Sequence, residues 1–110
     1  VKGIVDVDYM KMQVDFYLGK TDRLMYSNNG ITGDSQMALR VNKVCKYAKE
    51  KGIKWIHLLG GGWSLEDIRS WKRFDSIDSM DSIAYYTSYK EFGANNALEA
   101  LNNIRNIFIR

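Results

Sequence analysis

The stretch that decides the fold is Lys54–Ser82, which reads KWIHLLGGGWSLEDIRSWKRFDSIDSMDS. Its pattern predicts a buried strand over Ile53–Leu59, a turn of glycines, a short helix and a second strand over Phe74–Met80. Ser64 is placed to cap the helix, because Asp67 follows three residues later as in a capping box. The unit has the length of one βαβ motif, so we expect parallel strands joined by a helix.

The same alternation of strands and helices continues on both sides of this stretch. The predicted elements are a strand end at Gly3–Val7, a helix at Tyr9–Leu18, a strand at Arg23–Ser27 closed by the turn Asn28–Gly30, a helix between Thr32 and Gly52, an aromatic loop at Tyr85–Tyr89 and a last helix at Asn95–Phe108. The helix after Thr32 is the clearest, because Met37, Val41, Val44 and Ala48 form one apolar stripe. Asp34 or Thr32 is expected to cap it.

Four strand–helix alternations predict an α/β fold with parallel strands and right-handed crossovers. A (β/α)8 barrel needs about 250 residues, so 110 residues would supply its C-terminal half. A small open α/β sheet is the alternative. The chain, residues 1–110, is expected to be a single domain and possibly a fragment of a larger barrel.

The composition excludes several classes of protein. A hydrophobic fraction of 45% is typical of globular domains, and no apolar run is long enough to cross a membrane. The single cysteine, Cys45, excludes an internal disulfide and favours a reducing, cytoplasmic location. With one histidine besides, no metal site and no cofactor are expected. The net charge of +3 is compatible with a polyanionic partner.

The glycine turn and the aspartates that follow it are the main candidates for chemistry. Gly60, Gly61 and Gly62 let the backbone approach an anion, although a tight strand-to-helix turn explains them equally well. Asp75 and Asp78 are three residues apart, so on one strand they would point to opposite faces. The alternative is that these aspartates cap the following helix or turn.

Other side chains suggest a nucleic-acid partner. Arg40, Lys43 and Lys46 could contact phosphates, although a solvated helix face is the more common role. Trp63 directly follows the glycines and could stack on a base. His57 lies inside an apolar strand, where a packed core histidine is the alternative to a substrate-binding one.

The segment His57–Asp78 resembles the last barrel strands of tRNA-guanine transglycosylases and their DNA 7-deazaguanine transglycosylase relatives. In that family a glycine-containing run ends one strand and an aspartate pair lies on the next. The matching runs here are His57–Gly62 and Phe74–Ser79, within residues 54–82. The family's zinc ligands, three cysteines and a histidine, have no counterpart in this sequence.

This resemblance implies that guanine in tRNA or DNA is exchanged for a 7-deazaguanine base. By motif position Asp78 would be the nucleophile that attacks the ribose, with Asp75 as its companion. A homodimer or a partner chain would complete the barrel. Two alternatives remain open: a phosphate-binding barrel fragment that acts on a small phosphorylated metabolite, and a non-catalytic α/β interaction module.

Overall fold

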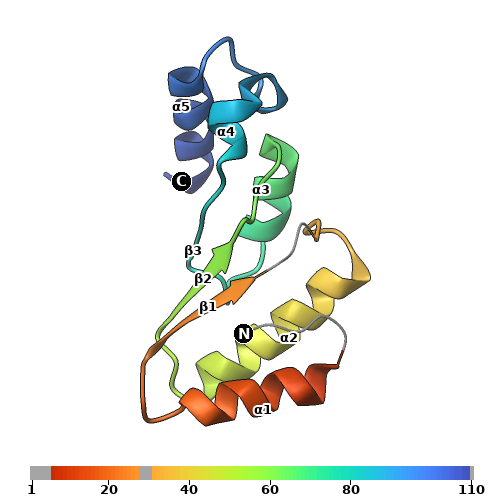
Figure 1. The fold of residues 1–110 in the computed structure, drawn as a ribbon, viewed down its shortest axis with the longest axis vertical. Helices are drawn as coiled ribbons and strands as arrows, with labels where there is room; N and C mark the ends of the chain where they lie inside the picture. Colours follow the sequence, from red (N-terminus) through yellow and green to blue (C-terminus); the bar gives the residue numbers. More distant parts are fainter. Residues whose placement is uncertain (1–5, 28–30, 110) are drawn as a thin grey trace.

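The computed structural model describes residues 6–27 and 31–109, which form a mixed α/β fold around a small open sheet of parallel strands (Figure 1). The three strands are β1 (Arg23–Ser27), β2 (Trp55–Leu59) and β3 (Ser79–Met80), in the order β1-β2-β3. The helices are α1 (Val7–Tyr17), α2 (Gln36–Glu50), α3 (Leu65–Lys72), α4 (Ala84–Thr87) and α5 (Ala97–Phe108), with a short 3-10 helix, η1 (Tyr89–Phe92).

The fold is elongated, with dimensions of 44 × 24 × 20 Å. In Figure 1, α1 and α2 lie at one end, the sheet lies in the middle, and α4 and α5 lie at the other end. The mixed α/β class and the parallel strands are confirmed, in the form of a small open sheet. The turn predicted at Asn28–Gly30 and most of the strand end predicted at Gly3–Val7 lie outside the described residues, and Val7 itself begins α1.

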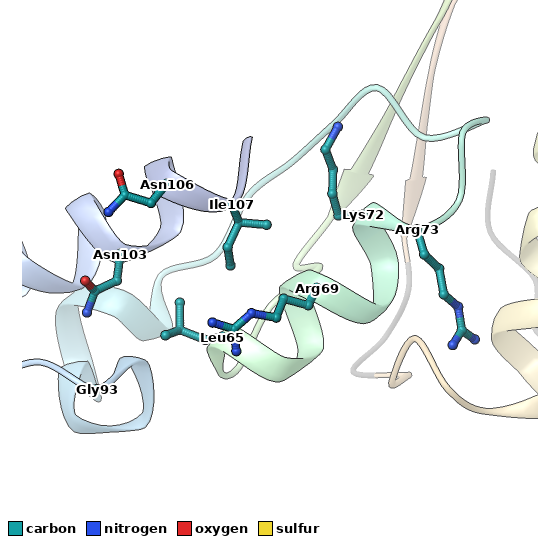
Figure 2. Close-up of a pocket in the computed structure, with 8 residues that line it drawn as sticks. All are labelled: Leu65, Arg69, Lys72, Arg73, Gly93, Asn103, Asn106 and Ile107. Atoms are coloured by element: carbon teal, nitrogen blue, oxygen red, sulfur yellow. The ribbon is translucent and has the colours of Figure 1, made fainter. Parts of the chain in front are cut away.

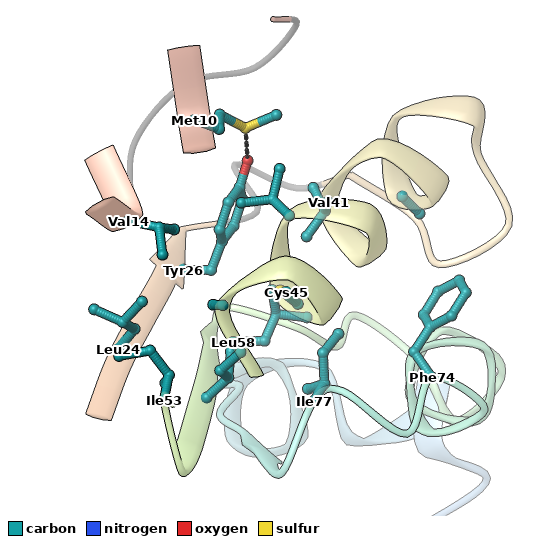
Figure 3. Packing of buried hydrophobic residues seen from close by; sticks show 14 of the residues in the cluster. Met10, Val14, Leu24, Tyr26, Val41, Cys45, Ile53, Leu58, Phe74 and Ile77 are labelled. Carbon is teal, nitrogen blue, oxygen red and sulfur yellow. Dashed lines mark hydrogen bonds between the residues drawn. The ribbon is translucent and has the colours of Figure 1, made fainter. Parts of the chain in front are cut away.

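One face of the sheet is buried and forms the main core (Figure 3). Leu24 and Tyr26 of β1 and Ile56 and Leu58 of β2 point into it, where they meet apolar side chains of α1 and α2. Trp71, near the end of α3, is fully buried in the same cluster. The helices α1, α2 and the end of α3 therefore pack on the same side of the sheet.

The opposite face of the sheet is largely open. Successive residues of a strand point to opposite faces, which places Met25, Trp55 and His57 on this side. Met25 is 59% exposed and Trp55 is 45% exposed. Parallel sheets usually have both faces covered, so this open face is unusual for a parallel sheet.

A second apolar cluster lies beyond the sheet, where α3 and α4 pack against α5. Its fully buried members include Phe92 of η1 and Ala100 of α5, and Ile68 of α3 contacts them from the other side. Met80 packs against both clusters and so links β3 to α5. This second cluster positions the segment after β3, which carries the candidate site.

The last strand is much shorter than predicted. Phe74–Met80 was expected to be a strand, but β3 contains only Ser79 and Met80. Phe74 and Ile77 belong to the turn that precedes β3, and both are buried in the main core. These two side chains are therefore apolar because they fill the core beside α3, and not because they belong to a paired strand.

The helix ends partly agree with the sequence predictions. Ser64 caps α3 as predicted, because its side chain accepts a hydrogen bond from the Asp67 N–H. The cap of α2 is Ser35, not Asp34 or Thr32, because the Ser35 hydroxyl accepts from the Ala38 N–H. The aromatic loop predicted after residue 84 is instead helical, in α4 and η1.

Candidate functional site

A carboxylate lies where the parallel strands end, and it belongs to Asp81. Asp81 is the first residue after β3, and its N–H donates to the carbonyl of Leu58 at 3.3 Å. Its side-chain Oδ1 accepts a 2.6 Å hydrogen bond from the Gly60 N–H. Its own carbonyl accepts from the Gly61 N–H at 2.9 Å. The glycine turn and the end of β3 are therefore joined through Asp81.

His57 holds the other oxygen of the same carboxylate. Its Nε2 lies 3.2 Å from Asp81 Oδ2, and its Nδ1 lies 2.7 Å from Ser79 Oγ. A carboxylate can only accept, so in neutral His57 the proton is on Nε2 and Nδ1 accepts from the Ser79 hydroxyl. Trp55 Nε1 donates to the same hydroxyl at 2.9 Å. Three side chains on the open side of the sheet, those of His57, Ser79 and Trp55, thus orient the Asp81 carboxylate.

The surroundings of Asp81 keep its carboxyl group ionised. The Gly60 N–H and, to a smaller extent, His57 lower the pKa of Asp81 below its ordinary value, although partial burial opposes this shift. The side chain of Asp81 is 56% exposed, whereas that of His57 is 22% exposed. The site therefore presents a charged, oriented and accessible carboxylate, which is what a nucleophile or a general base requires.

A cavity of ≈ 310 Å³ opens beside Asp81, between the end of β3 and α5. It is lined by one carboxylate, one hydroxyl, one phenol and several apolar side chains, from Ile68, Met80, Asp81, Ser82, Tyr85, Leu101, Ile104 and Phe108. This volume is at the lower end of the range for small-molecule pockets. The lining suits a flat, largely apolar group that approaches Asp81.

No protein-family model, curated protein or solved structure matches this chain.

The glycine turn is shaped by packing as well as by the site. Gly60 has a φ of 67°, a conformation that side chains rarely adopt. A Cβ at Gly62 would lie 2.5 Å from a side-chain carbon of Ile68, so α3 could not pack as it does. The N–H groups of Gly60 and Gly61 are bound to Asp81, and that of Trp63 donates to Asp67 at 3.2 Å. The anion that the turn binds is therefore the chain's own carboxylate.

Asp75 and Asp78, the predicted catalytic pair, are placed differently from expectation. Asp75 is exposed on the turn before β3. Asp78 lies directly before β3, where its Oδ2 accepts from the Ile56 N–H at 2.8 Å and from Lys49 Nζ. Parallel strands present ligand sites at their carboxyl ends, so Asp78 occupies the opposite edge of the sheet from Asp81. Asp78, expected within a strand over Phe74–Met80, therefore lies before β3 and not on it.

Of the other predicted residues, His57 contacts Asp81 in the site, and Trp63 directly follows the glycine turn in the chain. Trp63 is 60% exposed and follows the glycine turn directly, so stacking on a base stays a prediction for it. Arg40, Lys43 and Lys46 are exposed on α2, which covers the buried face of the sheet. Their contact with a nucleic acid also stays a prediction, and the sheet separates them from His57.

Within residues 6–27 and 31–109, no group of three or more His, Cys, Asp and Glu side chains could hold a metal ion. No helix in this described part has the length and apolar character needed to cross a bilayer. Cys45 is a free thiol, 2% exposed, and burial raises its pKa to about 12. It is therefore a core residue, as predicted, and takes no part in the site.

Replacing Asp78 with asparagine should destabilise the fold without changing the site at Asp81. The neutral amide loses the ion pair with Lys49, whose side chain is only 27% exposed. Hydrogen bonds to charged groups contribute about 1.5–3 kcal/mol, so we expect the free energy of unfolding to fall by about that amount. Urea unfolding at neutral pH measures it. An unchanged urea midpoint in Asp78→Asn would contradict this structural role.

The contribution of Asp81 to stability should depend on pH. Because folding lowers its pKa, the ionised carboxylate stabilises the fold above the unfolded-state value of about 3.8. This stabilisation is lost as the pH falls below that value, through the lower pKa of the folded state. Solvent screens a side chain that is 56% exposed, so the effect should stay below about 1 kcal/mol. Urea midpoints of wild type and Asp81→Asn should converge in acid; a constant difference between pH 7 and pH 2 would contradict it.

Proposed function

We propose that this chain carries the nucleophilic carboxylate of a base-exchanging transglycosylase that acts on tRNA or DNA, and that the nucleophile is Asp81. One observation carries the proposal: an ionised, oriented carboxylate stands at the carboxyl end of β3 and lines a cavity. The expectation that Asp78 is the nucleophile is replaced, because Asp78 is engaged by Lys49 at the other edge of the sheet.

The chemistry would proceed by two displacements at one carbon. Asp81 Oδ2 attacks the anomeric carbon of the nucleotide, a C–O bond forms, and the bond from that carbon to guanine breaks with its electron pair on the base. The departing guanine takes up a proton, and the incoming 7-deazaguanine base, after losing its proton, attacks the same carbon and releases the carboxylate. His57 supports this cycle by holding Asp81 in one orientation at 3.2 Å.

The cavity beside Asp81 supports a purine-like base as the small substrate. The rings of Tyr85 and Phe108 and the apolar chains of Met80 and Ile104 line ≈ 310 Å³ next to the carboxylate. Aromatic and apolar walls bind the faces of a flat heterocycle. The phosphate-binding alternative is weaker, because the N–H groups of Gly60 and Gly61 already bind Asp81.

The arrangement of the sheet supports a barrel that other strands complete. The strands follow one another in the order β1-β2-β3, and α2 and the end of α3 pack on the same side. A single winding of this kind also occurs in (β/α)8 barrels, and in such a barrel the interior face would carry Met25, Trp55 and His57. The edges of β1 and β3 would pair with strands of a second copy or a partner chain. The free thiol of Cys45 is compatible with a cytoplasmic location.

A non-catalytic module is the competing interpretation, and the cavity beside Asp81 argues against it. A second competing interpretation is a hydrolase whose catalytic residues are Ser79, His57 and Asp81. Ser79 donates to His57 in that arrangement, but it also accepts from Trp55, and it does not line the cavity that Asp81 lines. Of these three residues, only Asp81 lines the cavity.

The proposal is tested by incubating the protein, with any chain that copurifies, with tRNA or DNA that carries labelled guanine, in the presence of a 7-deazaguanine base. We expect label to be released and a covalent adduct between protein and nucleic acid to appear on a denaturing gel when the base is omitted. Neither release nor adduct with tRNA and DNA alike would refute the proposal. Sedimentation of the same sample gives the mass of the assembly, which distinguishes a homodimer from a complex with another chain.

A further inference from the structure

A second cavity, larger than the one at Asp81, lies between α3 and α5 (Figure 2). It has a volume of ≈ 690 Å³, in the middle of the range for pockets that hold small molecules. Its walls are Leu65, Arg69, Lys72 and Arg73 of α3, Asn103, Asn106 and Ile107 of α5, and Gly93. Three of these residues are cations and none is acidic, so the lining carries positive charge.

Arg69 is the cation that faces the cavity. In Figure 2 its guanidinium extends along α3 toward Leu65, and Asn103 of α5 lies beyond Leu65. Glu66 lies 3.5 Å from it, but both side chains are more than half exposed, so this pair is weak. Arg73 points away, toward Asp34, with which it forms a 2.7 Å ion pair. A guanidinium presents two parallel N–H donors, which match the oxygens of a phosphate.

The opposite wall offers groups that could recognise a base. The Asn103 amide donates to the Phe92 carbonyl at 2.8 Å, which fixes its orientation and leaves its own carbonyl oxygen able to accept. Asn106 adds a second amide on the same helix. A side-chain amide can both donate a hydrogen bond to the edge of a base and accept one from it. Ile107 and Leu65 supply the apolar surface that a flat ring needs.

We propose that this cavity binds a nucleotide, with its phosphate on Arg69 and its base between Ile107 and the two amides. Lys72 also lines the cavity, and its Nζ lies 5.3 Å from the centre of the Phe108 ring. This site does not depend on the chemistry of Asp81, which lines a different cavity. The nucleotide can be free or part of a nucleic-acid strand, since the phosphate ester and base are the same.

The experiment is a titration followed by amide NMR spectra, with AMP, GMP, the matching nucleosides, inorganic phosphate and a four-nucleotide strand as probes. We expect shifts at the Arg69 side-chain N–H and the Asn106 amide group, with the mononucleotide binding about tenfold more tightly than the nucleoside or phosphate alone. A strand that binds about tenfold more tightly again identifies nucleic acid as the source of the nucleotide, and equal affinity identifies the free nucleotide.

Arg69→Gln should weaken binding of the mononucleotide by about tenfold or more, and Asn106→Ala by about threefold. Arg105→Gln is the matched control for the loss of charge. Arg105 is exposed on α5, the helix that carries Asn106, and it does not line the cavity. It should change the affinity by less than about twofold. Equal losses in Arg69→Gln and Arg105→Gln, or shifts confined to other residues, would overturn the proposal. The NMR spectrum itself reports whether each variant is folded.

Discussion

Replacement of Asp81 by asparagine should reduce base exchange by about 10⁴-fold or more, which is the scale seen when the central groups of a catalytic site are removed. Asparagine keeps the size of the side chain and can still accept the Gly60 N–H through its amide oxygen. It cannot form a stable glycosyl intermediate, because the amide oxygen is a weak nucleophile. Release of labelled guanine measures the loss, and the covalent adduct should disappear with it.

Asp78→Asn is the matched control for this result, since it removes the same charge three residues earlier in the chain. Asp78 is bound to Lys49 and to the Ile56 N–H at the other edge of the sheet. We therefore expect this variant to keep its exchange activity at a temperature where it is folded, while it loses stability. Loss of activity in Asp78→Asn, together with activity retained in Asp81→Asn, would return the nucleophile to Asp78 and contradict our assignment.

The elements with regular periodicity could be predicted from the sequence. Arg23–Ser27 was predicted with the bounds that β1 has, and the stripe of Val41, Val44 and Ala48 is buried on α2 as expected. Both patterns are strong because tertiary packing on a single face imposes them. Met37, at the first turn of α2, is only partly buried, whereas its neighbour Ala38 is fully buried in the main core.

The candidate site could be predicted only in part, because it depends on where β3 begins. Phe74 and Ile77 are apolar and were expected to be strand residues. They lie in a turn, and their side chains are buried in the core. Asp78 was expected to be the nucleophile from its motif position, on a strand predicted over Phe74–Met80, whereas it lies before β3 and Asp81 lies directly after β3. A turn that buries apolar side chains cannot be told from a strand by periodicity alone. The spacing of the aspartates by three gave no further help, since each one follows an apolar residue and precedes a serine.

Trp71→Ala should have the largest effect on stability among the changes considered, with a loss of about 3–5 kcal/mol in the free energy of unfolding. Trp71 is fully buried, and its ring packs against Phe74 with centroids 5.8 Å apart. It also ties α3 to the main core, on which the end of the glycine turn and β3 depend. The total free energy of unfolding of a domain is about 5–15 kcal/mol, so the variant should unfold at much lower urea concentrations.

Trp63→Ala is the matched control, because Trp63 lies eight residues earlier and is 60% exposed. It removes the same ring from the surface, so the free energy of unfolding should change by less than about 0.5 kcal/mol. Trp71→Phe covers the case in which Trp71→Ala does not fold, since phenylalanine fills part of the space and should give a smaller loss. Equal urea midpoints for Trp63→Ala and Trp71→Ala would mean that α3 is not anchored by Trp71. The position of the glycine turn, and with it the orientation of Asp81, would then need another support.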